Sequence, residues 1–383
     1  MLFAFCYGHI SLSPMSRDRQ CSQLASSLLS WFAANARDLP WRRTRDPYAI
    51  WVSEIMLQQT QVKTVIPYYD RWMRKLPTIE ALAKAHPDKI HKLWEGLGYY
   101  TRVRNMQKAA QQIIAEHDGK FPQTFDAVLA FPGVGRYTAG AICSIAFNQP
   151  TPILDGNVIR VLTRVYGIKT DPREKQTNAQ IWHLAGLLVN EAALPRPETL
   201  CFASRASHLN QSLMELGALL CTPRSPNCTA CPVQKLCVAQ KERRQDQLPN
   251  LAKREAVTKR RCIAFVVERD GKYLVRQRPE GVVNAHLWEF PNAETGARVC
   301  DPQHTTAKGW GLSITASKPL RTIIHSITRY RITLEAWRAE PAAASAKLPG
   351  HWLTPKQLDQ LAFTSAHKKI LAHLGAPFSK SAH

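Results

Sequence analysis

Four cysteines fall within the short segment CTPRSPNCTACPVQKLC, residues 221–237, and limit how that part of the chain can fold. Six, two and five residues separate the successive cysteines. Structural zinc sites usually combine two short Cys-x2-4-Cys pairs, whereas this segment contains one. The spacing therefore favours an iron–sulfur cluster, with zinc and four unligated thiols as the alternatives. The candidate ligands are Cys221, Cys228, Cys231 and Cys237.

The same segment is rich in proline and has too few apolar residues to form a core of its own. A loop of this kind needs a bound metal centre to hold one conformation. We expect the centre to be structural and to close the end of a helical domain. In that position, Arg224 and Lys235 would face a phosphate backbone.

The chain carries a large excess of positive charge. Its 51 Lys and Arg residues outnumber 29 Asp and Glu residues, for a formal net charge of +22 and a pI of about 9.8. Such a charge favours a polyanionic partner, and nucleic acid is the leading candidate. A membrane is disfavoured, because no apolar run approaches the roughly 18 residues of a spanning helix and the basic residues are dispersed.

With 383 residues, the chain exceeds the usual size of one domain, so we expect two. Apolar residues recur every three or four positions over residues 17–240, which predicts an all-α domain. A basic and polar stretch, residues 241–260, indicates a linker. Residues 261–375 combine strand-like segments, an Asp-Gly hairpin turn and short helical segments, a pattern typical of an α+β domain. The remaining segments are a poorly structured extension, residues 1–16, and a tail, residues 376–383.

Two glycines mark a turn between helical segments in FPGVGRYTAG, residues 131–140. A turn built on Gly133 and Gly135 exposes backbone N–H groups near a helix N-terminus, where a phosphate can bind. The alternative is an ordinary connection between two helices. The sequence predicts the turn but does not choose between these roles.

Two polar residues come just before an apolar helix in LDGNVIRVLTRVYG, which begins at residue 154. Asp155 or Asn157 can act as the N-cap of that helix. Taken alone, the segment favours this structural role over a catalytic one.

A single acidic residue lies inside the apolar helix predicted for DPYAIWVSEIMLQQTQV, residues 46–62. Burial of Glu54 in such a helix would raise the pKa of its carboxyl group and make it a proton donor near neutral pH. The alternative is a partly exposed residue that pairs with a cation such as Lys63.

Together, the glycine turn, the aspartate about twenty residues later and the cysteine loop resemble the helix-hairpin-helix DNA glycosylases that carry a [4Fe-4S] cluster. Four stretches resemble, in the same order, the MutY family of adenine DNA glycosylases. They are SEIMLQQTQV, GLGYYTRVRN, FPGVGRYTAGAI and LDGNVIRVL. With the cysteine loop, they extend over most of residues 30–240. The resemblance implies a multidomain protein with an all-α helix-hairpin-helix glycosylase domain, a [4Fe-4S] loop at 221–237 and a C-terminal α+β Nudix-like domain.

The resemblance also implies roles for individual residues. Glu54 would protonate the departing adenine and then activate water, while Asp155 would stabilise positive charge on the deoxyribose. Asn157 and Tyr137 would position water and intermediate. Relatives that also cut the strand carry a lysine where this chain has Tyr137, so we expect a monofunctional enzyme. The implied DNA contacts are Gln58, Gln59, Tyr99, Gly133 and Gly135.

In this family, the C-terminal domain helps to recognise 8-oxoguanine opposite the adenine. CIAFVVERDGKYLVRQRPEG and LWEFPN resemble its opening, but the nearby acids lack the glutamate spacing that a magnesium-dependent Nudix hydrolase needs. The Phe-Ser-His turn common in the family is replaced here by Ile327, Thr328 and Arg329. We expect Thr328 to lie near the lesion, with Tyr330 or His325 as possible substitutes for the missing side chains.

These observations predict a bacterial-type, cytoplasmic and nucleoid-associated monomer that acts on double-stranded DNA. Its substrate would be adenine opposite 8-oxoguanine or guanine. One alternative is a cluster-bearing glycosylase for thymine or an oxidised pyrimidine, and the Glu54 helix and the C-terminal domain argue against it. Another is a redox-responsive DNA-binding regulator that has lost catalysis.

Overall fold

A computed structural model describes residues 14–195, 204–252, 256–295, 314–327, 329–341 and 350–374. The chain forms two compact units. The first comprises Met1–Met73, Thr78–Glu80 and Ala109–Lys253, and the second comprises Arg74–Pro77, Ala81–Lys108 and Arg254–His383. The predicted tail, 376–383, and most of the predicted extension lie outside the described residues. Within that extension, helix α1 already begins at Pro14.

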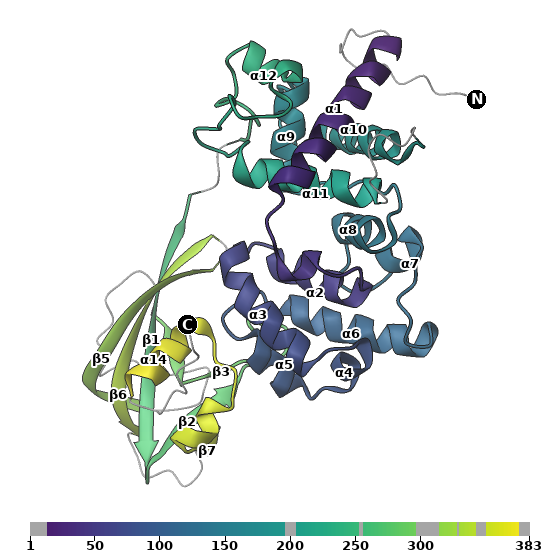
Figure 1. Cartoon of the computed structure of the whole chain (residues 1–383). Helices are drawn as coiled ribbons and strands as arrows, with labels where there is room; N and C mark the ends of the chain where they lie inside the picture. Colours follow the sequence, from purple (N-terminus) through teal and green to yellow (C-terminus); the bar gives the residue numbers. More distant parts are fainter. Residues whose placement is uncertain are drawn as a thin grey trace. The chain divides into compact units, whose positions relative to one another are not determined.

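The part of the chain before residue 242 is helical, as predicted. Its helices are α1 (Pro14–Asn35), η1 (Pro40–Arg42), α2 (Pro47–Leu57), α3 (Val62–Lys75), α4 (Ile79–Lys84), α5 (Pro87–Trp94), α6 (Thr101–Glu116), α7 (Phe125–Leu129), α8 (Arg136–Phe147), α9 (Gly156–Tyr166), α10 (Lys175–Ala193), α11 (Arg205–Leu219), η2 (Gln234–Leu236) and α12 (Val238–Lys241). Figure 1 shows α1, α9, α10 and α11 grouped around one core, to which the cysteine loop also contributes. Helix α2 packs beside α8 in the same unit. No helix in the described part of the chain is long and apolar enough to cross a membrane.

Helix α2 is shorter than predicted. It starts at Pro47, where the Asp46 side chain accepts a hydrogen bond from the Tyr48 N–H at 3.1 Å. It ends at Leu57, because Gln58 leaves the helical conformation with a ψ of 110° and Gln59 has a φ of 58°. A bend at these two glutamines therefore separates α2 from α3, where the sequence predicted one continuous helix.

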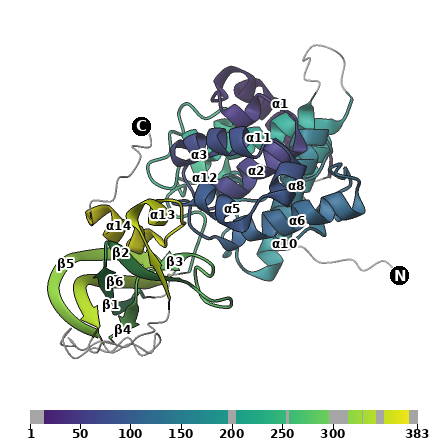
Figure 2. The same cartoon turned by 90° about the horizontal axis from the view of Figure 1, so that it is seen from below.

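The second unit contains a seven-stranded mixed sheet in the order β3-β2-β1-β6-β5, with β4 paired to β1 and β7 paired to β2. Its elements are β1 (Thr258–Arg269), β2 (Lys272–Gln277), β3 (Trp288–Glu289), β4 (Asn292–Glu294), β5 (Ile314–Ile327), β6 (Tyr330–Pro341), β7 (His351–Leu353), α13 (Pro355–Asp359) and α14 (Ser365–His373). The predicted turn joins β1 to β2, with φ of 52° at Asp270 and 69° at Gly271. Figure 2 shows α13 and α14 on one face of the sheet, where Leu358 and Ile370 belong to its core.

The start of one strand and the domain assignment of one segment differ from the sequence prediction. Strand β1 begins at Thr258, inside the segment predicted as a linker. Residues 81–108, which we placed in the helical domain, belong to the second compact unit. The residue after α5, Glu95, has a buried carboxylate that accepts a hydrogen bond from the Phe363 N–H at 3.0 Å. Contacts of such large sequence separation cannot be read from periodicity.

Candidate active site

A cavity of about 500 Å³ opens in the helical unit and collects most of the predicted site residues. Its walls come from η1, α2, α8, α11 and the start of α9. The predicted residues among its lining are Glu54, Gln58, Gln59, Tyr137, Asp155 and Asn157. The predicted residues thus share one concave site, whose lining extends from Arg37 to Ala218 in the sequence.

Glu54 is buried in the cavity wall, with 4% of its surface exposed. The Tyr137 hydroxyl donates a hydrogen bond of 2.7 Å to its Oε2. Burial raises the pKa of Glu54 to about 7; the Tyr137 hydrogen bond opposes this rise, and the charge of Asp155 adds to it. The alternative of a partly exposed Glu54 paired with Lys63 is therefore wrong.

Tyr137 is held as a neutral phenol. Burial and the neighbouring carboxyl groups of Glu54 and Asp155 raise its pKa well above 10. Its hydroxyl also lies 3.3 Å from the Met214 sulfur. The side chain therefore acts as a fixed hydrogen-bond donor toward Glu54.

Asp155 is the N-cap of α9, as the structural interpretation of this segment predicted. Its carboxylate accepts hydrogen bonds from the Val158 N–H at 2.7 Å and from Asn157 Nδ2 at 2.9 Å. Burial raises the pKa of Asp155, and these hydrogen bonds oppose the rise. The capping geometry also places the carboxylate at the cavity, so the two roles predicted for Asp155 are compatible.

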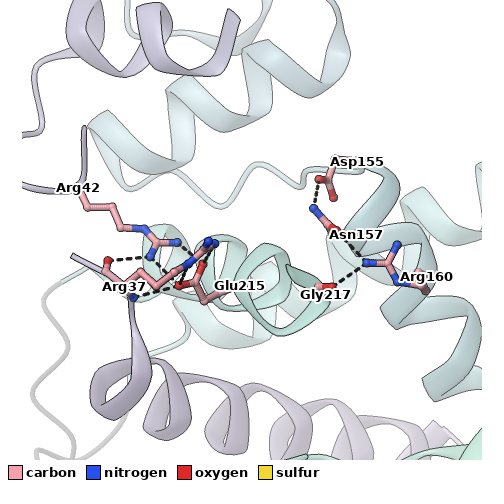
Figure 3. A network of polar contacts seen from close by, with 7 residues as sticks. All are labelled: Arg37, Arg42, Asp155, Asn157, Arg160, Glu215 and Gly217. Carbon is pink, nitrogen blue, oxygen red and sulfur yellow. Dashed lines mark hydrogen bonds and ion pairs between the residues drawn. The ribbon is translucent and has the colours of Figure 1, made fainter. Parts of the chain in front are cut away.

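Arg160 holds Asn157 in place and links it to the chain near the cysteine loop (Figure 3). Its Nη2 donates to Asn157 Oδ1 at 2.8 Å and to the Gly217 carbonyl at 2.7 Å, and its Nε donates to the Cys221 carbonyl at 2.7 Å. A Cβ atom at Gly217 would lie 2.6 Å from the Asn157 Cβ. Only glycine therefore allows α11 to approach the start of α9 this closely.

Sequence reasoning missed a charged cluster in the cavity wall, formed by Arg37, Arg42 and Glu215 (Figure 3). The Glu215 side chain is 1% exposed and pairs with Arg37 at 2.7 Å and Arg42 at 2.9 Å. Burial alone would raise the pKa of Glu215, but the two arginines outweigh it and lower the pKa to about 2. The signal was available, because Glu215 is a lone acid among apolar residues in SLMELGALL, like Glu54 in its own helix.

The glycine turn between α7 and α8 forms as predicted. Gly133 has a φ of 76°, and Gly135 is the N-cap of α8 without a side-chain capping bond. A Cβ at Gly135 would meet no atom within 4 Å, so the space beside it is open. The first N–H groups of α8 thus have no side-chain cap where an anion could approach.

The predicted DNA-contact residues have different surroundings. Gln58 Nε2 donates to Thr138 Oγ1 at 3.4 Å, whereas Gln59 is exposed. In the second unit, Tyr99 has 47% of its surface exposed and a φ of 47°. Thr328 lies outside the described residues.

The four cysteines of the loop line one small cavity beside α9. Arg164 Nη1 lies 3.3 Å from the Cys221 sulfur and also donates to the Thr222 carbonyl at 2.7 Å. In the described part of the chain, no group of three or more His, Cys, Asp or Glu side chains is arranged to hold a single metal ion. Four soft sulfur donors around a shared cavity, next to a guanidinium group, fit the chemistry of an iron–sulfur cluster.

Comparisons with known proteins identify the family. Residues 52–186 match the HhH-GPD superfamily base excision DNA repair proteins, residues 262–373 a NUDIX domain, and residues 221–237 the iron-sulfur binding domain of endonuclease III. The adenine DNA glycosylase of Rattus norvegicus is 37% identical over 408 residues, which cover 90% of this chain and 76% of the relative. That of Homo sapiens is 35% identical, with 90% of this chain and 72% of the relative covered. The chain belongs to the adenine DNA glycosylase family.

A bacterial relative and a solved structure extend the comparison. The adenine DNA glycosylase of Buchnera aphidicola subsp. Schizaphis graminum is 37% identical, with 70% of this chain and 74% of the relative covered. The structure of a thermostable thymine-DNA glycosylase is 29% identical, covers 59% of this chain and 98% of its own, and has a TM-score of 0.51. As a member of the adenine DNA glycosylase family, the chain is an enzyme that hydrolyses N-glycosyl bonds.

Membership of the adenine DNA glycosylase family confirms the predicted fold class, a helical glycosylase domain with a cysteine loop and a Nudix-like domain. The match of residues 221–237 to the iron-sulfur binding domain of endonuclease III indicates a [4Fe-4S] cluster, and this segment contains the four cysteines predicted as its ligands. Two of the acids near the start of the Nudix-like unit form ion pairs with arginines. Glu289 is buried and pairs with Arg276 and Arg278, and Glu294 pairs with Arg260. Both carboxylates are therefore paired with arginine side chains of the same protein.

Proposed function

We propose that the protein removes adenine from double-stranded DNA where it is mispaired with 8-oxoguanine or guanine, acting as a monomer and without cutting the strand. The observation that carries this proposal is the buried carboxyl group of Glu54, with a pKa raised to about 7, in the same cavity as Asp155. A cavity of about 500 Å³ can take a nucleobase that has been flipped out of the duplex.

The carboxyl groups of Glu54 and Asp155 have different roles in the reaction. Adenine is a poor leaving anion, so Glu54 donates a proton to the ring as the N-glycosidic bond opens. Positive charge then develops on the deoxyribose, and the ionised Asp155 stabilises it. Glu54, now a carboxylate, takes a proton from the water that attacks the sugar. Tyr137 holds Glu54 by its hydrogen bond, and Asn157 holds Asp155.

The paired charges of Arg42 and Glu215 form a fixed polar wall of the cavity. A buried ion pair keeps its geometry because breaking it would leave an uncompensated charge. The wall therefore keeps a fixed arrangement of charges beside the base that enters the cavity.

Strand cleavage through a Schiff base needs an amine nucleophile at the sugar. None of the described residues that line the cavity is a lysine, and Tyr137 is a phenol whose pKa lies well above 10. We therefore assign a monofunctional, purely hydrolytic reaction. The [4Fe-4S] cluster supplies no step of it; the cysteines that hold it order the loop beside α9.

A single-turnover assay tests the proposed function. Duplexes with adenine opposite 8-oxoguanine, guanine or thymine are incubated with excess protein, and the products are split with and without alkali. The proposal expects breaks at the adenine that appear only after alkali treatment, fastest opposite 8-oxoguanine. Tight binding without base release from any duplex would contradict it and favour the regulator.

The base opposite the adenine is read, we propose, by the tip of the hairpin that joins β5 to β6. Ile327 pairs with Tyr330, and the Arg260 guanidinium carbon lies 3.9 Å from the centre of the Tyr330 ring. Arg329 Nη2 donates to the Tyr330 hydroxyl at 3.2 Å. Arginine forks recognise the acceptor edge of guanine, and aromatic rings stack on bases.

Arg329→Ala and Tyr330→Ala are each expected to reduce the preference for 8-oxoguanine over guanine by about 10-fold, because a good base-edge contact is worth roughly 1–3 kcal/mol. The measurement is the ratio of single-turnover rates on the two duplexes. Arg321→Ala, at an exposed arginine of β5, the strand that leads into the hairpin tip, is the matched control. Thr328→Ala tests the residue predicted from the sequence. An unchanged ratio in all three hairpin variants would remove this hairpin from lesion recognition.

A further inference from the structure

The segment between Glu95 and α6, residues 96–100, forms a turn that we call the Tyr99 turn. Glu95, the residue before this turn, has a buried carboxylate that contacts distant parts of the second unit. Glu95 follows the last residue of α5, and its side chain is 5% exposed. Its Oε1 accepts from the Phe363 N–H at 3.0 Å, and its Oε2 accepts from Lys368 Nζ at 2.7 Å. Lys92 Nζ lies 3.0 Å from Oε2 and donates to the Leu361 carbonyl. One carboxylate thus binds a backbone N–H and two lysines.

The segment around Phe363, which donates its N–H to Glu95, is part of the core of the sheet. Phe363 has 1% of its surface exposed and lies beside Phe290, with ring centres 5.8 Å apart. Trp288 of β3 exchanges backbone hydrogen bonds with both sides of it, donating to Ala362 O and accepting from the Thr364 N–H. A displacement of Glu95 would therefore require a displacement of this core segment.

A second set of contacts joins α5 and α6 to the loop before β3. Arg104 Nη1 donates to the Ala285 carbonyl at 3.0 Å. The His91 ring stacks on His286, with centres 6.3 Å apart and planes inclined by 10°. Contacts on both sides of the Tyr99 turn thus fix α5 and the start of α6 to the sheet.

The turn itself holds an aromatic side chain in a costly conformation. Gly96, Gly98 and Tyr99 all have positive φ, at 110°, 71° and 47°, and a residue with a side chain adopts this conformation only when its surroundings impose it. Trp94 Nε1 donates to the Gly98 carbonyl at 3.0 Å, and the Arg102 guanidinium carbon lies 5.7 Å from the centre of the Tyr99 ring. The result is an exposed ring on a rigid support, which suits stacking against bases.

We propose that Glu95 is a positioning residue that fixes the Tyr99 turn to the C-terminal sheet, so that both meet the DNA as one surface. The proposal rests on the proposed function, because it assigns to this surface the reading of the base opposite adenine. Because Glu95 is buried, we assign it a role through the turn and not through contact with substrate. Its loss leaves the carboxyl groups of the helical cavity in place and loosens the turn.

Hydrogen exchange in the free protein tests the anchor without any assay of activity. In Glu95→Gln, the side chain keeps its size and can still accept from the Phe363 N–H, but it loses its charge toward Lys368 and Lys92. We expect amides 96–100 and 362–364 to exchange about tenfold faster, since hydrogen bonds to charged groups are the stronger ones. Lys368→Met is expected to have the same effect, and the double variant little more. Glu116→Gln, an exposed glutamate of α6, is the control. Unchanged exchange at the turn in Glu95→Gln would overturn the proposal.

The second readout separates a positioning role from a general loss of structure. The two substrates are duplexes with adenine opposite 8-oxoguanine and opposite guanine. If native protein acts on both, we expect Glu95→Gln to reduce the preference for 8-oxoguanine over guanine by about tenfold. At saturating protein, its rate opposite 8-oxoguanine should stay within about twofold of native, because the reacting groups are untouched. An unchanged preference, or an equal loss of rate on both duplexes, would contradict the proposal. Absence of base release by native protein would instead contradict the proposed function, and the exchange result would still decide whether Glu95 is an anchor.

Discussion

Glu54→Gln is expected to slow adenine release by about 10²–10⁴-fold, the range that a positioned general acid contributes, while DNA affinity stays close to native. Glutamine keeps the size of the side chain, and its carbonyl oxygen can still accept the hydrogen bond from Tyr137. It has no acidic proton for the departing base and cannot take one from water. Single-turnover rates and a separate binding titration measure the two effects.

The pH dependence identifies Glu54 as the acid rather than a structural residue. Its pKa, raised by burial to about 7, keeps the carboxyl group protonated below neutrality. The native rate is therefore expected to be highest on the acid side of pH 7 and to fall by about tenfold per pH unit well above it. The residual rate of the glutamine variant should lack this fall. A native rate that is flat through neutral pH would contradict the assignment.

Protein stability supplies the control for folding. The pKa of Glu54 is about 7 in the folded protein, above its ordinary value of 4.5, so the stability linked to it is complete below pH 4.5 and is lost as pH rises through 7. Above pH 7, the native protein holds a buried charge that Glu54→Gln does not. The variant should therefore have a higher Tm than native at alkaline pH, and this advantage should shrink as the pH is lowered. A variant that is inactive because it is misfolded would have a lower Tm throughout.

Local patterns in the sequence were sufficient for residues whose role depends on their own helix. Glu54 stands out as the one acid in an apolar helix, and Asp155 as a capping residue before another. The end of α2 was not predictable in the same way, because the bend at Gln58 and Gln59 contains neither glycine nor proline. That bend brings Gln58 to the cavity wall.

Long-range pairing explains the residues that were missed. Arg37 meets Glu215 over 178 positions, and Glu95 meets Phe363 over 268. Each pair joins positions far apart in the sequence, so no local pattern shows which residues meet. The lone acid in the α11 sequence could have marked Glu215 as buried and paired, but not which arginines pair with it.

Asp155→Asn is expected to reduce the rate of adenine release by about 10²–10³-fold or more, as the loss of a fixed charge at a developing cation does. The asparagine oxygen can still accept from the Val158 N–H and cap α9. Its amino group, however, faces Asn157 Nδ2, and Arg160 prevents Asn157 from turning because it donates to Asn157 Oδ1. The lost hydrogen bond costs about 1 kcal/mol of stability, and removal of a carboxylate whose pKa is raised by burial offsets part of that cost. Single-turnover rates and Tm values measure the two effects separately.

The Asp155→Asn variant also tests whether Asp155 affects the pKa of Glu54. The negative charge of Asp155 helps to raise the pKa of Glu54, so its removal should lower that pKa and move the fall in rate to lower pH. Asp171→Asn is the matched control, since Asp171 also accepts backbone hydrogen bonds, from the N–H groups of Arg173 and Ala252, and is not among the residues that line the cavity. It should leave both the rate and the pH profile unchanged. A slow Asp155→Asn enzyme with a native pH profile would mean that the two carboxyl groups do not interact, and Asp155 would then be a structural cap rather than the partner of Glu54 in the reaction.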